Sequence, residues 1–148
     1  MIGTCRYVSV NSHKGFELSR RDDLITLGYV MVSLFKGSLP WQNIVINKNS
    51  ARYRKVGKFK SRYSNRKLCR GCPPQFKEYM NYVTALDFED AADFEFLKSL
   101  IEKVAVKENL NIFDNIFDWS ILLTNQEKIP SSKNITKKEF MAHFAKFD

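Results

Sequence analysis

Acidic residues are missing from the middle of this 148-residue chain, because none lies between Leu24 and Lys77, where 12 Lys or Arg occur. From Glu78 to Asp118 the balance reverses, with ten acids against three Lys. The formal net charge is +8, and its uneven placement predicts a surface divided into a basic and an acidic part. We therefore expect the basic part to have an anionic partner.

Glycine and proline are scarce, at six and four residues, whereas phenylalanine occurs 12 times. This composition argues against a disordered chain and against a loop-rich disulfide scaffold. The three cysteines are an odd number, and no secretory leader is recognisable, so we expect an intracellular protein of the cytoplasm or nucleus. No apolar run approaches the ~20 residues of a membrane span, and no lipid-anchor pattern occurs, so no membrane association is expected.

Hydrophobic periodicity predicts a mainly α-helical single domain. A capping-box pattern over 19–22 introduces a helix over 24–35 that is apolar on nearly every face and stops at Gly37. Because this helix has no polar face, we expect it at the centre of the core, with Leu27 as a core residue.

The other expected elements are less apolar. A short surface helix is predicted over 47–59, and amphipathic helices follow over 75–85 and 92–106. Residues 1–20 and 62–71 show no clear period and are expected to be loops. The sequence further predicts a short helix within 112–123 and a weak helix over 137–147.

Two motifs indicate a family. The first motif has the sequence Gly3-Thr4-Cys5-Arg6-Tyr7-Val8-Ser9-Val10-Asn11-Ser12-His13. It resembles the segment that ends the activation loop of casein kinase 1 protein kinases. These kinases carry Ser-Ile-Asn where most kinases carry Ala-Pro-Glu, and Ser9-Val10-Asn11 matches that form. The stretches 19–30 and 37–42 are similar to the buried central helix of the kinase C-lobe and to the turn after it. The resemblance implies a helical C-lobe, as a partial kinase domain over 1–123, followed by a divergent polar tail over 124–148.

The resemblance also implies binding residues. Arg6 and Arg52 correspond to residues that hold the phosphate of a pre-phosphorylated substrate, and guanidinium groups suit phosphate oxygens. Thr4 corresponds to the threonine beside the incoming substrate hydroxyl. Asn43 stands where the family has glycine in the phosphate site, so the match there is partial. The alternative for both arginines is that they are solvated surface charges.

Three further residues match structural positions of the family. Ser9 and Asn11 belong to the segment that replaces Ala-Pro-Glu, and Asp23 corresponds to the aspartate that meets the catalytic loop. Because no catalytic-loop motif occurs in this chain, we expect Asp23 to act only in capping the helix and stabilising its dipole.

Catalysis is not expected from these 148 residues. Phosphoryl transfer requires a Gly-rich loop, a strand Lys, an H-R-D loop and a D-F-G motif, and none of them occurs. The family uses ATP and Mg²⁺, but we expect this chain to have no catalytic residue, cofactor or metal. A covering partner, or the upstream kinase half from the same or another chain, is expected to shield its apolar surface.

Three functions remain open. The first is the C-lobe part of a casein kinase 1-like serine/threonine kinase, inactive by itself, from a family that phosphorylates acidic or pre-phosphorylated proteins. The second is a non-catalytic module that binds phosphorylated or acidic proteins. The third and least favoured is a nucleic-acid binder that uses the basic run 48–70 and its aromatic residues.

The cysteines and histidines suggest no further site. Cys69 and Cys72 form a C-x-x-C pair, but zinc would require a second pair, which is missing. His13 lies in the family-like segment and is expected to pack rather than to act as a base. His143 has no partner that the sequence identifies.

Overall fold

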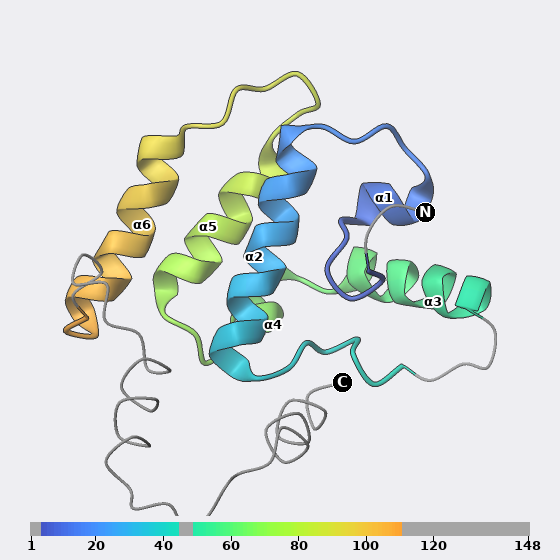
Figure 1. Cartoon of the computed structure of the whole chain (residues 1–148), viewed down its shortest axis with the longest axis horizontal. Helices are drawn as coiled ribbons and strands as arrows, with labels where there is room; N and C mark the ends of the chain where they lie inside the picture. The colour runs from blue at the N-terminus through green and yellow to red at the C-terminus, as the bar shows by residue number, and fades with distance from the viewer. Residues whose placement is uncertain (1–3, 45–48, 111–148) are drawn as a thin grey trace, which may run out of the picture. The chain divides into compact units, whose positions relative to one another are not determined.

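The computed structural model describes residues 4–44 and 49–110, and its regular elements in these ranges are α-helices (Figure 1). They are α1 (Val10–Lys14), α2 (Arg20–Lys36), α3 (Asn49–Arg62), α4 (Asn65–Leu68), α5 (Pro74–Ala85) and α6 (Phe94–Lys107). The prediction of a mainly α fold is confirmed. The helices predicted within 112–123 and 137–147, the boundary at 123, and His143 lie outside the described residues.

The chain divides into two compact units, Met1–Val104 and Ala105–Asp148. The second unit contributes to the described residues only the end of α6 and the stretch to Leu110, whose backbone N–H donates to the Ala105 carbonyl at 2.8 Å. The core and the candidate site below belong to the first unit.

Helix α2 begins and ends where its sequence predicts. The Asp22 carboxylate accepts a hydrogen bond from the backbone N–H of Ser19 at 3.1 Å, which is the carboxylate half of the predicted capping box. At the other end Gly37 adopts a φ of 77°, and its N–H donates to the Ser33 carbonyl at 2.8 Å. Glycine takes this left-handed conformation without a steric cost, so the helix stops there.

One face of α2 forms the core, with Ile25, Tyr29 and Val32 buried. The prediction that the helix is buried all round is wrong, because Leu27 is 48% exposed and Leu34 is 80% exposed. The described part of the chain packs α5 against one face of α2 and leaves much of the other face open. Leu27 lines an apolar groove of about 370 Å³ together with side chains of α5 and α6, so it is not a core residue.

Helices α2 and α5 lie side by side in close contact (Figure 1). The approach requires Gly28, because a Cβ atom there would overlap the Sδ atom of Met80 and lie 3.0 Å from the Tyr79 ring. The Tyr79 hydroxyl donates to the Leu24 carbonyl at 3.1 Å. The apolar face of α5 is buried, as the amphipathic pattern over 75–85 predicts, and its buried residues are Phe76, Tyr79, Met80 and Val83.

Two short helices occupy segments that were expected to be loops. The Ser9 hydroxyl accepts the Ser12 backbone N–H at 3.1 Å and starts α1, and the Ser64 hydroxyl accepts the Lys67 N–H at 3.4 Å and starts α4. Helices of four or five residues are too short to show a hydrophobic period, so pattern reading missed them. Their capping serines were the available signal.

Helix α3 extends three residues beyond its predicted end at 59 and is more than a surface helix. Val56 and Lys60, one turn apart, are both buried, and α1 packs against α3. A Cβ atom at Gly57 would lie 2.6 Å from the Cβ atom of His13, so the two helices approach as closely as glycine allows.

None of the helices in the described ranges has the length and apolar character needed to cross a membrane.

Candidate anion-binding site

Arg6 lies in a tight turn that precedes α1. The backbone N–H groups of Tyr7 and Val8 both donate to the Thr4 carbonyl, at 3.1 and 3.3 Å. Each carbonyl of such a turn that is buried needs a hydrogen-bond donor. The partners here come from distant parts of the chain.

Two side chains hold three carbonyls of this turn. The indole Nε1 of Trp41 donates to the Arg6 carbonyl at 2.7 Å. The Lys60 ammonium on α3 donates to the carbonyls of Cys5 at 3.1 Å and Val8 at 2.7 Å. The backbone around Arg6 is therefore tied both to α3 and to the turn that follows α2.

Arg6 and Arg52, far apart in the sequence, line one small pocket. Its volume is about 20 Å³, and its other lining residues are Cys5, Trp41, Gln42 and Val56. Arg52 donates from Nη2 to the Gln42 carbonyl at 3.4 Å, and the Arg6 guanidinium carbon lies 5.7 Å from the centre of the Tyr7 ring. The described residues that line it include two arginines and no carboxylate, so this part of the pocket is a shallow cationic depression that suits an anion at its mouth.

Lys60 is 4% exposed, and the structure shows no carboxylate paired with it within the described ranges. Its ammonium lies 5.0 Å from the ring centre of Tyr29 and 4.9 Å from that of Trp41, within the range of cation–π attraction. Burial lowers the pKa of Lys60 to about 7, and only the nearby Cys5 opposes this effect. Burial of the Cys5 thiol raises its pKa, and the positive charges of Lys60 and Arg52 oppose this rise.

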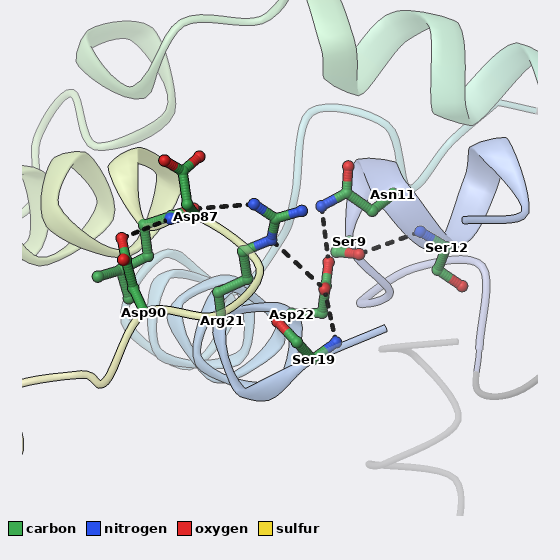
Figure 2. A network of polar contacts seen from close by, with 9 residues as sticks. Ser9, Asn11, Ser12, Ser19, Arg21, Asp22, Asp87 and Asp90 are labelled. Atoms are coloured by element: carbon green, nitrogen blue, oxygen red, sulfur yellow. Dashed lines mark hydrogen bonds and ion pairs between the residues drawn. The ribbon is translucent and has the colours of Figure 1, made fainter. Parts of the chain in front are cut away.

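A polar network connects the start of α2 with α1 (Figure 2). Asp22 is 2% exposed, and its carboxylate accepts from Asn11 Nδ2 at 3.0 Å as well as from the Ser19 backbone. Arg21 lies 3.8 Å from the same carboxylate and donates to the Leu86 carbonyl at 3.0 Å. Buried carboxylates need such compensation, and this network fixes α1 relative to α2.

The structure places the other predicted residues as follows. Ser9 is buried and caps α1, and Asn11 reaches Asp22, so both serve the connection between α1 and α2. Asp23 is exposed in the first turn of α2, where an acid suits the helix dipole, and its neighbour Asp22 makes the capping-box contact predicted over 19–22. Thr4 is exposed at the start of the turn, and Asn43 is exposed and does not line the pocket.

His13 packs against Tyr53, with ring centres 4.2 Å apart. Burial and the charge of Lys60 lower the pKa of His13 to about 4, against the backbone groups of Tyr53 and Cys5. A histidine that is neutral at physiological pH between α1 and α3 fits a packing role.

Cys69 and Cys72 are free thiols, and burial raises the pKa of Cys69 to about 11. Within 4–44 and 49–110, no three His, Cys, Asp or Glu side chains are grouped to hold a metal.

Lys60 and the indole N–H of Trp41 were not among the predicted residues of the site. Lys60 is one of 12 cations in an acid-free stretch, so its charge did not single it out. The available signal was spacing, because Lys60 follows the apolar Val56 by one helical turn and therefore shares its buried face.

The comparisons agree with the motifs that carry the site. The chain is 42% identical over 122 residues to casein kinase I homolog 2 of Schizosaccharomyces pombe, and 40% identical over 122 residues to casein kinase I homolog 3 of the same yeast. The resemblance to casein kinase I is confirmed. Each alignment covers 82% of this chain and 28% of the relative, so the chain spans less than a third of these kinases. No protein-family model matches the chain.

The casein kinase I relationship agrees with the helical fold. The matching region is the C-lobe of the kinase domain, which is mainly α, as are the described residues here. Arg6 and Arg52, the two positions that the resemblance linked to phosphate, come together at one pocket.

Proposed function

We propose that this casein kinase I-like chain binds phosphorylated or acidic protein segments at the Arg6–Arg52 pocket and does not itself transfer phosphate. The observation that carries the proposal is that two arginines, 46 positions apart in the sequence, line one pocket. A guanidinium presents a planar set of N–H donors that matches phosphate oxygens, and two of them can share one dianionic group.

The basic run 48–70 could also bind nucleic acid, but the packing of its aromatic rings favours a protein ligand. Tyr53 packs against His13, and Phe59 stacks on Tyr63 with ring centres 5.2 Å apart. Single-stranded nucleic acids bind through rings that are open to stack on bases. These rings already have protein neighbours, which supports protein recognition over base stacking.

A phosphoserine peptide should bind more tightly than the same peptide without phosphate. Arg6→Ala and Arg52→Ala should each lower the affinity for the phosphopeptide by ~1.5–3 kcal/mol, because each removes charged hydrogen bonds to the phosphate. The double variant should lose less than the sum of the single losses, since both side chains serve one ligand. Isothermal titration at a fixed salt concentration measures all three.

Arg66→Ala is the matched control, because Arg66 is an exposed cation on α4 that does not line the pocket. It should leave the preference for phosphopeptide unchanged. Equal affinity for both peptides, or equal losses for Arg66 and the pocket arginines, would mean diffuse electrostatics and would refute the site. Steep salt dependence without phosphopeptide preference would favour nucleic acid instead.

Nucleotide binding should be undetectable for the purified 148-residue chain. The chain contains no recognisable Gly-rich loop, phosphate-binding strand Lys or D-F-G aspartate, so neither ATP phosphates nor Mg²⁺ has its usual ligands. Titration with Mg·ATP should give no heat above dilution, and incubation with casein should transfer no phosphate above a protein-free blank. Micromolar ATP affinity would contradict the proposal that the chain is inactive.

A further inference from the structure

Lys60 stands out because its ammonium is almost completely buried, and no carboxylate among residues 4–44 and 49–110 is paired with it. Such burial is costly unless the ammonium makes other strong contacts. Its contacts are the carbonyls of Cys5 and Val8, which lie on either side of Arg6 in the chain. We propose that Lys60 is a positioning residue of the anion site, which holds the Cys5–Val8 turn so that Arg6 is presented beside Arg52.

The position of Lys60 on α3 gives this role its geometric basis. Arg52 lies on the same helix, about two turns earlier at ~3.6 residues per turn. One rigid helix therefore carries Arg52 directly and fixes Arg6 through Lys60. The spacing of the two guanidinium groups then depends on the length of α3 rather than on a flexible connection.

Without Lys60, the turn would keep some of its hydrogen bonds and lose others. The Thr4 carbonyl bonds keep the turn closed, and Trp41 holds the Arg6 carbonyl. The carbonyls of Cys5 and Val8 would lose the Lys60 donor that each has here. We expect the turn to open locally and the Arg6 guanidinium to sample orientations away from Arg52.

This inference rests on the proposed phosphate-recognition function, and its alternative is that Lys60 merely fills the core with its methylene chain. Lys60→Met separates the two roles, because methionine keeps the length and apolar volume but has no N–H group. Lys58→Met is the matched control, since Lys58 is an exposed lysine of the same helix.

We expect Lys60→Met to remain folded and to bind the phosphoserine peptide at least tenfold more weakly, with unchanged affinity for the unphosphorylated peptide. In the ligand-free protein, amide hydrogen exchange at Tyr7 and Val8 should accelerate at least tenfold, while exchange in α5 stays constant. Lys58→Met should alter neither exchange nor the preference for phosphopeptide. These exchange measurements need no ligand, so they test the positioning role even if the wild type shows no phosphopeptide preference and the proposed function fails.

Three results would overturn the positioning role. One is phosphopeptide affinity within twofold of wild type, and another is exchange at Tyr7 and Val8 that does not change. The third is equal acceleration throughout the protein, which would indicate a general loss of stability. If Lys60→Met does not fold, Lys60→Leu, which also lacks an N–H group, replaces it in both assays, and failure of both variants to fold would assign Lys60 to stability alone.

Discussion

The Val32→Asp variant should be unfolded at room temperature. Val32 is 1% exposed at the centre of the face that α2 turns to the core, among apolar neighbours. An unpaired carboxylate in such surroundings costs several kcal/mol, in addition to the lost packing, against a total stability of ~5–15 kcal/mol for a domain. Circular dichroism should show the helical signal lost, without a cooperative melting transition.

Leu34→Asp supplies the matched control on the same helix, because Leu34 is 80% exposed. Its carboxylate would remain in water, so the melting temperature should stay within a few degrees of wild type. Leu27→Asp, at a half-exposed position, should fall between the two. Unfolding by Leu34→Asp with a stable Val32→Asp variant would mean that the opposite face of α2 is the buried one.

The free energy of unfolding should rise by roughly 2 kcal/mol between pH 6.5 and 8.5, because of Lys60. The pKa of Lys60 is about 7 in the folded chain, below its ordinary value of 10.5, so the unfolded chain binds this proton more tightly. A rise in pH through this window removes the proton from the folded state first and favours folding, by up to ~1.4 kcal/mol per pH unit. Urea unfolding at a series of pH values measures the slope.

The Lys60→Met variant isolates this effect, because its stability should be nearly flat over the same window. Other groups act mainly outside it. His13, with a pKa of about 4, contributes stability that grows from pH 4 to its ordinary 6.5. Cys69, with a pKa of about 11, contributes stability that is lost as the pH rises above its ordinary value of 9. A slope in the variant equal to that of wild type would show that Lys60 does not titrate in this range.

The long helices could be predicted because their determinants are local. Ser19 and Asp22 start α2, Gly37 ends it, and Pro74 stands in the first turn of α5. In α5 the apolar spacing also identified the buried face, whereas in α6 it placed the exposed Phe94 on the same face as the buried Leu97 and Leu100. In α2 it failed, because a helix that is apolar nearly all round does not reveal which face meets a partner.

The residues of the candidate site were only partly accessible to sequence reasoning. The resemblance to casein kinase 1 indicated Arg6 and Arg52 individually, and the sequence itself identified the caps, the long helices and the acid-free stretch. Tertiary structure alone decided that Asp22 rather than Asp23 is buried, since adjacent residues on a helix point ~100° apart and only packing selects one. It also decided that Lys60 is buried, because its carbonyl partners come from a distant turn that no local pattern connects to α3.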